Sequence, residues 1–249
     1  MKRLGKTAFS LLFWVFFMVS SALFFCLALL VFLLTRLFDS NGLVLHLFSC
    51  FWAQVYFYCN PFWRLRVTGR ENIPWRGPAV LVANHQSLGD ILVVFGLYRP
   101  FKWVSKSSVF NLPLIGWNMR LNRYMALVRG DKASITRVMA QCRGWLDKGV
   151  PVLFFPEGTR SVNGEVQTFK DGAFRLAIEK GCPVIPIVLL GTSDTLPKHG
   201  MVLDTRANCT VEVLKPVDVR SFGDDVIKLR DHVRELIVER VKSGSSLGN

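Results

Sequence analysis

The chain has 249 residues, which is enough for one sizeable domain and an additional segment. Hydrophobic residues make up 51% of it and concentrate in residues 1–63, whereas the remainder has the composition of an ordinary globular domain. The net charge is +13, yet the sequence contains no zinc motif or aromatic RNA-binding signature. We therefore expect no nucleic-acid partner, and the charge favours an anionic membrane surface or a phosphorylated ligand.

The first expected element is a membrane helix. Leu11 to Leu34 is an uncharged run of 24 residues, rich in leucine, phenylalanine and valine. As a helix it would be about 36 Å long, which is enough to cross a bilayer and too long for the core of a signal peptide. Lys2, Arg3 and Lys6 precede it, which indicates that the N-terminus faces the cytoplasm.

A second apolar stretch, Leu43 to Tyr58, follows a turn at residues 39–42. Because arginines also follow this stretch, we expect a helical hairpin with both ends on the cytoplasmic side. The hairpin either spans the bilayer or dips into one leaflet. The alternative is a single span followed by a buried helix of the body, which would place the body on the far side. We predict an anchor at residues 1–63, an α/β domain at 64–242 and a polar tail at 243–249.

The body alternates between short apolar runs and amphipathic segments. The runs predict strands at residues 79–83, 101–104, 125–128, 150–155, 184–190 and 209–214. Helical spacing predicts helices at residues 91–98, 131–148, 173–180 and 224–242. This alternation is typical of an α/β fold with a mostly parallel sheet flanked by helices.

The first group of candidate catalytic residues directly follows the strand predicted at residues 79–83. Asn84, His85 and Asp90 lie between that strand and the next helix, at the edge where open α/β sheets bind ligands. The loop allows Asp90 to accept a hydrogen bond from one imidazole nitrogen of His85, which leaves the other nitrogen free to take a proton. On its own the pair also fits a helix-capping aspartate beside a core histidine.

A second polar segment, Pro156 to Ser161, follows the strand at 150–155. Its sequence is Pro-Glu-Gly-Thr-Arg-Ser, which places Glu157, Gly158 and Arg160 at a strand end. Glycine allows the backbone to approach a ligand closely, and an arginine can bind a phosphate with two hydrogen bonds. Alone, the segment also fits a surface turn with a solvated ion pair.

Together, the two segments resemble the glycerolipid acyltransferase family, whose members acylate glycerol-3-phosphate and lysophosphatidic acid. Residues 84–90 match its N-H-x-S-x-x-D signature, and residues 156–161 match its P-E-G-T-R-S signature. Residues 126–130 look like the family's block that ends in arginine, although its usual Phe-Ile-Asp is missing. Residues 169–173 and 184–187 resemble two further blocks. The short chain with an apolar N-terminus looks most like the bacterial 1-acylglycerol-3-phosphate acyltransferases.

The resemblance implies transfer of an acyl chain from acyl-CoA or acyl carrier protein to the sn-2 hydroxyl of lysophosphatidic acid, giving phosphatidic acid. His85 would be the general base and Asp90 its orienting partner, with no acyl-enzyme and no cofactor besides the acyl donor. The implied substrate-binding residues are Lys106, Arg129, Glu157, Gly158, Thr159 and Arg160. Arg129 and Arg160 are the candidates for the phosphate, while Glu157 would hold the glycerol or brace an arginine.

Other catalytic chemistries have little support in the sequence. The six cysteines form no C-x-x-C pair, so we expect free thiols and a reducing, cytoplasmic compartment. The four histidines lack metal-ligand spacing, and we expect no metal. We place the domain on the cytoplasmic face of the inner membrane, among anionic lipids. The remaining alternatives are an acyltransferase for another lysophospholipid and a non-catalytic membrane lipid-binding protein.

Overall fold

The computed structural model describes residues 2–161, 164–195 and 206–246. The helices are α1 (Lys2–Thr35), α2 (Leu43–Tyr58), α3 (Gly89–Phe95), α4 (Ile115–Leu121), α5 (Lys132–Asp147), α6 (Gly172–Lys180) and α7 (Val226–Ser246). The strands are β1 (Trp63–Thr68), β2 (Val80–Ala83), β3 (Lys102–Lys106), β4 (Met125–Leu127), β5 (Val152–Phe154), β6 (Val184–Leu190) and β7 (Ala207–Val213).

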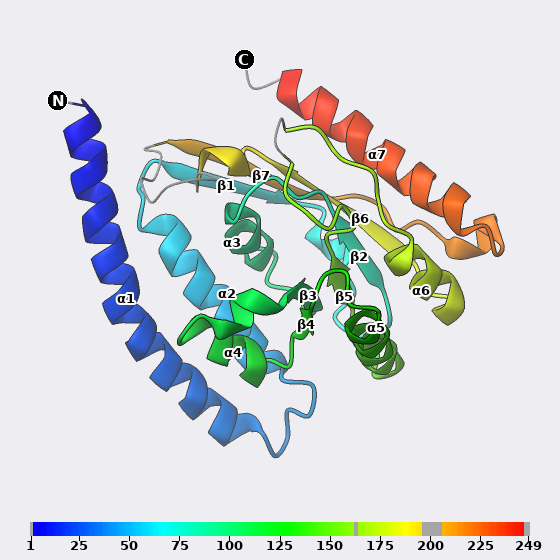
Figure 1. The fold of residues 1–249 in the computed structure, drawn as a ribbon, viewed down its shortest axis with the longest axis horizontal. Coiled ribbons are helices and arrows are strands. Elements are labelled where there is room, and N and C mark those ends of the chain that lie inside the picture. The colour runs from blue at the N-terminus through cyan, green and yellow to red at the C-terminus, as the bar shows by residue number, and fades with distance from the viewer. Residues whose placement is uncertain (1, 162–163, 196–205, 247–249) are drawn as a thin grey trace.

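The strands form one sheet in the order β1-β7-β6-β2-β5-β3-β4. Every neighbouring pair is parallel except β6 and β7, which run antiparallel. Helices α2, α3 and α4 lie on one face of the sheet, with α1 outside them, and α5, α6 and α7 lie on the other face (Figure 1). The predicted α/β fold with a mostly parallel sheet is confirmed.

Most of the predicted elements are present, with ends that differ by a few residues. The sequence analysis missed the edge strand β1 and the short helix α4. In β1, apolar Trp63, Leu65 and Val67 pack against the core while the residues between them face outward, which is the alternation of a half-buried strand. At the other end, α7 continues to Ser246, four residues into the predicted polar tail, and residues 247–249 lie outside the described part.

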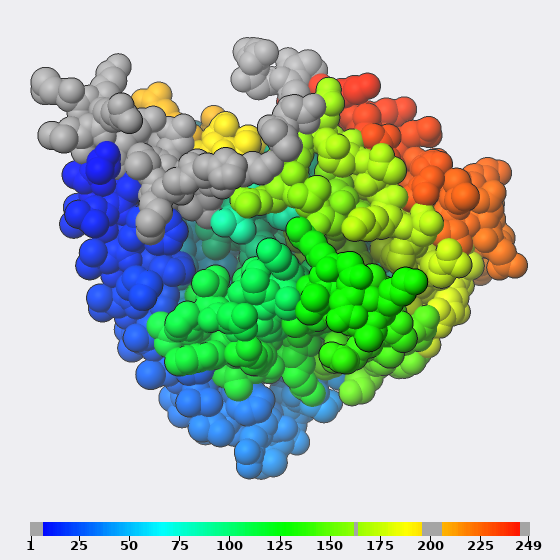
Figure 2. All heavy atoms as spheres, viewed as in Figure 1, coloured from blue at the N-terminus to red at the C-terminus, as the bar shows by residue number. Residues whose placement is uncertain are grey.

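Helix α1 lies along one flank of the body (Figures 1 and 2). It is the one helix in the described residues that is long and apolar enough to cross a membrane. Its inner face stacks on α2, where Phe24 lies 5.6 Å from Trp52 between ring centroids, and the hydroxyls of Ser20 and Ser21 contact that of Tyr56. The hairpin is therefore a packed unit in which α2 separates α1 from the sheet.

Helix α2 is bound to the body by polar contacts as well as by packing. The imidazole of His46 contacts the Tyr124 hydroxyl at 2.7 Å and the Arg99 carbonyl at 2.9 Å. The guanidinium of Arg123 donates to the carbonyl of Ser40 in the turn between α1 and α2. These contacts combine features of both predicted arrangements, because α2 completes the hairpin and is also a buried helix of the body.

Lys102 is a buried cation beside this hairpin turn. It is 2% exposed, and its ammonium donates to the Asn122 carbonyl at 2.8 Å and lies 4.9 Å from the ring centroid of Trp145. Burial and, to a smaller extent, the nearby Arg123 lower the pKa of Lys102 to about 7, while Asp39 acts in the opposite direction. The folded chain thus releases this proton far more readily than the unfolded chain does.

We predict that the free energy of unfolding rises with pH between about 7 and 10. Over this range the folded protein has lost the Lys102 proton while the unfolded chain, with a lysine pKa near 10.5, still binds it. Below pH 7 the cost of burying the charge is fully present. Chemical denaturation in detergent at several pH values measures the slope, which Lys102→Met should remove. The exposed Lys148, which also lies over Trp145, provides the control Lys148→Met, and an equal loss of slope there would contradict the assignment.

Candidate active site

The carboxyl ends of four parallel strands meet at one edge of the sheet. Strands β2, β5, β3 and β4 are neighbours in that order, so the segments that follow them share this edge. His85 follows β2, Glu157 follows β5, Lys106 ends β3, and Arg129 follows β4. The predicted site residues therefore lie on the same side of the molecule.

His85 and Asp90 are in direct contact. The Nδ1 atom of His85 lies 2.6 Å from Oδ2 of Asp90, and the imidazole ring packs against Phe155 with centroids 4.5 Å apart. The His85 side chain is 13% exposed and that of Asp90 is fully buried. A carboxylate can only accept a hydrogen bond, so Nδ1 of His85 carries the proton that is donated to Asp90. Nε2 is then left as the basic atom of the ring. The predicted pairing of the two side chains is present.

The carboxylate of Asp90 is held by donors from two parts of the chain. Its Oδ2 also accepts from the backbone N–H groups of Gln86, at 2.6 Å, and Ser87, at 3.0 Å. Its Oδ1 accepts from the hydroxyl of Thr192, which follows β6. The neighbouring Gly89 packs so closely on this segment that a Cβ there would lie 1.9 Å from Oγ1 of Thr195. The orientation of Asp90 is thus fixed on both oxygens.

The carboxylate of Glu157 binds backbone N–H groups of the site. Its two carboxylate oxygens accept from the N–H groups of His85, at 2.8 Å, and Gln167, at 3.1 Å, and the residue is 6% exposed. Burial raises the pKa of Glu157, while the two backbone hydrogen bonds lower it. Ser161 donates its N–H to the carbonyl of His85 at 2.8 Å. The second segment therefore holds the first in place by hydrogen bonds on both sides of the His85 backbone.

Arg160 is half-buried and incompletely bonded. Its Nη1 atom is buried and has no hydrogen-bond partner among residues 2–161, 164–195 and 206–246, which leaves a charged donor unsatisfied there. Gly158 adopts a left-handed backbone with φ of 69°, and a side chain there would meet the ammonium of Lys170. Thr159 is exposed, as are Lys106 and Arg129 at the ends of the neighbouring strands. Their roles in binding stay predictions.

The sequence analysis did not predict the supporting roles of three residues. The Asn84 side chain bonds both the N–H and the carbonyl of Leu189 on β6, at 2.8 and 2.9 Å. Thr192 bonds Asp90, and Gln167 bonds Glu157. The hydrogen bonds of these three residues join positions that are 10 to 105 residues apart in the sequence. Asn84 was the one with a signal, because a polar residue ends an otherwise buried strand there.

The structure offers little support for cysteine nucleophiles. All six cysteines are free, and burial raises the pKa of the Cys142 and Cys209 thiols to about 12 and that of Cys182 to about 11. Within residues 2–161, 164–195 and 206–246, no three His, Cys, Asp or Glu side chains gather as metal ligands. One of the four histidines, His199, lies outside those residues.

The general model of the acyltransferase family matches residues 64–190, which hold both polar segments. The chain belongs to this family. It is 42% identical over 182 residues to a 1-acyl-sn-glycerol-3-phosphate acyltransferase from Chlamydomonas reinhardtii, a match that covers 73% of this chain and 54% of the relative. A mouse protein of the same name, the alpha form, is 33% identical, with coverage of 74% and 67%.

The fold likeness of this acyltransferase family member extends to the apolar N-terminus. The crystal structure of the 1-acyl-sn-glycerophosphate (LPA) acyltransferase PlsC from Thermotoga maritima superposes with a TM-score of 0.82 at 25% identity, covering 98% of each chain. By contrast, the chain spans about half the length of the first curated relatives it matches.

Proposed function

We propose that this protein transfers a fatty acyl chain from acyl-CoA or acyl carrier protein to the sn-2 hydroxyl of 1-acylglycerol-3-phosphate, giving phosphatidic acid. The observation that carries the proposal is the buried His85–Asp90 pair with Nε2 left as a base, next to the cationic Arg160 segment. The relatives, which are named as 1-acyl-sn-glycerol-3-phosphate acyltransferases, support the same acceptor. A neutral alcohol needs such a base, because it is a poor nucleophile near pH 7.

In the proposed reaction, Nε2 of His85 takes the proton of the acceptor hydroxyl as its oxygen attacks the thioester carbonyl. Asp90 keeps the proton on Nδ1 and stabilises the imidazolium. The tetrahedral intermediate then expels the thiolate, which recovers the proton from Nε2. No acyl-enzyme is formed, and the buried cysteines, with their raised pKa values, are poorly suited to form one.

The phosphate of the acceptor is assigned to Arg160. A buried guanidinium nitrogen without a partner is costly to leave unpaired, and a phosphate oxygen would satisfy it. Glu157 is already occupied by two backbone N–H groups, so we propose that it positions His85 and does not bind the glycerol. Lys106 and Arg129 share the sheet edge and would add positive charge around the phosphate.

We predict that His85→Ala lowers kcat for acyl transfer by about 100- to 10,000-fold, because the proton acceptor is removed. Asp90→Asn should also lower kcat, since an amide cannot stabilise the imidazolium. The assay follows thiol release from acyl-CoA with lysophosphatidic acid as acceptor. Near wild-type turnover in His85→Ala would refute the base assignment. Wild-type protein that binds liposomes but releases no thiol with any lysophospholipid would be a lipid-binding protein.

We predict that Arg160→Ala raises the KM for lysophosphatidic acid by about tenfold or more, the usual effect of losing a charge-assisted hydrogen bond to phosphate. Arg175→Ala, at an exposed position of α6, is the matched control and should leave KM unchanged. A kinetic comparison with a lysophospholipid whose phosphate carries a choline distinguishes acceptors. An unchanged KM and kcat/KM for lysophosphatidic acid in Arg160→Ala would remove the phosphate role.

We further propose that α1 lies within one leaflet of the membrane. It has 34 residues and would be about 51 Å long, and it lies along one flank of the body, where α2 and α4 pack against it (Figure 2). The turn after α1 is also bound to the body through Arg123 and Ser40. If α1 stood perpendicular to the membrane, the polar body beside it would have to enter the hydrocarbon region. A helix that lies parallel to the membrane plane avoids this cost.

The outward face of the hairpin supports this placement. The large apolar side chains exposed on α1 include Leu11, Leu12, Val15, Met18, Val19, Leu23, Leu30 and Leu34. Phe51 on α2 and Trp117 on α4 are also exposed nearby. Such a continuous apolar surface fits the acyl region of a leaflet, and the basic N-terminal residues fit the anionic cytoplasmic face of the inner membrane.

We predict that cysteines placed at Ser40, in the hairpin turn, and at Lys132, on the body, react from the same side of sealed vesicles. Both positions are exposed, and an in-plane hairpin keeps them in the same aqueous compartment. Labelling with a membrane-impermeant thiol reagent is compared with that of the wild-type protein, whose native cysteines set the background. A third cysteine at Thr7, which is exposed at the N-terminal end of the apolar run of α1, completes the test. Labelling of Thr7 from the side opposite to Ser40 and Lys132 would show that α1 crosses the bilayer.

A further inference from the structure

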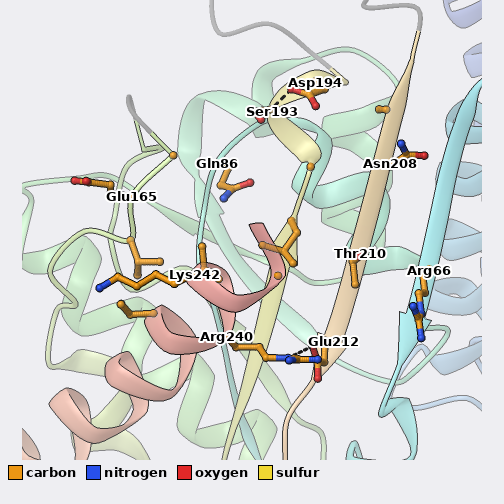
Figure 3. Close-up of a pocket in the computed structure, with 18 of the residues that line it drawn as sticks. Arg66, Gln86, Glu165, Ser193, Asp194, Asn208, Thr210, Glu212, Arg240 and Lys242 are labelled. Atoms are coloured by element: carbon orange, nitrogen blue, oxygen red, sulfur yellow. Dashed lines mark hydrogen bonds and ion pairs between the residues drawn. The ribbon is translucent and has the colours of Figure 1, made fainter. Parts of the chain in front are cut away.

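A large groove lies between α7 and the outer face of strands β1 and β7 (Figure 3). Its volume is about 1580 Å³, and none of His85, Asp90 or Arg160 lines it. The groove exists because α7 packs over β6 and leaves the polar faces of β7 and β1 uncovered. Asn208, Thr210 and Glu212 of β7 line its floor, which is about 13 Å long between the first and last of them.

One end of the groove reaches the proposed catalytic pair. Gln86 lines the groove, and its N–H donates to Asp90 at 2.6 Å. Its side-chain oxygen lies 3.4 Å from the hydroxyl of Thr192, which donates its proton to Asp90. Gly191 continues the wall, and Figure 3 shows Gln86 on the same side of the sheet as Thr210. A long ligand in the groove would therefore have one end beside the loop that carries His85.

Arg66 is well placed to bind a ligand in the groove. Arg240 is paired with Glu212 at 2.6 Å, and Arg234 donates to two backbone carbonyls. Arg66 lines the groove from β1, is exposed, and has no ion pair within the described part of the chain. An arginine in this situation suits a phosphate, which accepts two parallel hydrogen bonds from a guanidinium.

We propose that the groove binds the coenzyme A portion of an acyl-CoA donor, an inference that rests on the proposed acyl transfer. The pantetheine amides would hydrogen-bond to Asn208, Thr210 and Gln86, which supply both donors and acceptors. The thioester would leave the groove at Gln86, and the nucleotide phosphates would lie at Arg66. The acyl chain is transferred with His85 as the general base, as proposed above. Coenzyme A leaves as the thiolate and takes up the proton from His85.

The size of the groove favours coenzyme A over the arm of a carrier protein. Sites for small molecules usually enclose about 300–1,000 Å³, and this groove is larger. A single pantetheine arm is thin and needs a narrow channel, whereas a nucleotide with its phosphates needs width and cations inside the groove. Arg66 and Arg240 both line the groove itself.

The test compares Arg66→Ala with Arg64→Ala. Arg64 lies two positions earlier on the same face of β1 and is also exposed, but it does not line the groove. We expect Arg66→Ala to raise the KM for acyl-CoA about tenfold, as for one lost phosphate contact, and Arg64→Ala to change it little. Acyl-pantetheine, which lacks the nucleotide phosphates, should be used equally well by both variants and the wild type.

A binding measurement separates this proposal from the proposed reaction. Calorimetry with coenzyme A in the His85→Ala background reports the groove without turnover, and Arg66→Ala should weaken binding about tenfold there too. If acyl-CoA is used normally but neither variant alters KM or binding, the reaction stands and the groove assignment falls. If binding weakens only in Arg66→Ala but no donor is turned over, the site stands and the reaction falls. A defect confined to acyl carrier protein as donor would assign the groove to that protein instead.

Discussion

The parallel pairing of β2 with β5 is the constraint on which the candidate site depends. Val82 lies opposite Phe154, so the segments that follow the two strands begin side by side. Glu157 then reaches the N–H of His85, and Ser161 reaches its carbonyl. A loop without regular structure would leave an imidazole mobile. Here the two loops exchange hydrogen bonds, so the backbone beneath His85 is nearly as fixed as that of a strand.

A third strand completes this arrangement. The amide of Asn84 joins the end of β2 to Leu189 on β6, and the residues after β6 bring Thr192 to Asp90. Each member of the His85–Asp90 pair is therefore held by a different neighbouring strand. This division explains why the pair can be rigid although it lies in a loop: its supports come from elements that are buried in the core.

The predictable part of the fold and site was the part encoded locally. His85 and Asp90 are five positions apart, so their contact follows from a strand that leads into a helix, and the fully buried strands stand out as apolar runs. The contacts of Thr192 and Gln167 depend on tertiary packing and leave no mark in spacing. Strand β1 was missed for a different reason: its arginines were interpreted as charges flanking a membrane segment, which hid the alternation with Leu65 and Val67.

The polar residues of helix α2 were also misinterpreted in the sequence analysis, and their contacts fix the hairpin to the body. Its His46 and Gln54 looked like imperfections in an apolar segment, but they bind the Arg99 and Leu92 carbonyls of the body. With Ser40 also held by Arg123, the hairpin has no hinge of its own. The distance from the apolar face of α1 to His85 is therefore a fixed dimension of the folded chain. Under the proposed placement of α1 in one leaflet, a lipid acceptor would rise to the same height whatever the thickness of the surrounding bilayer.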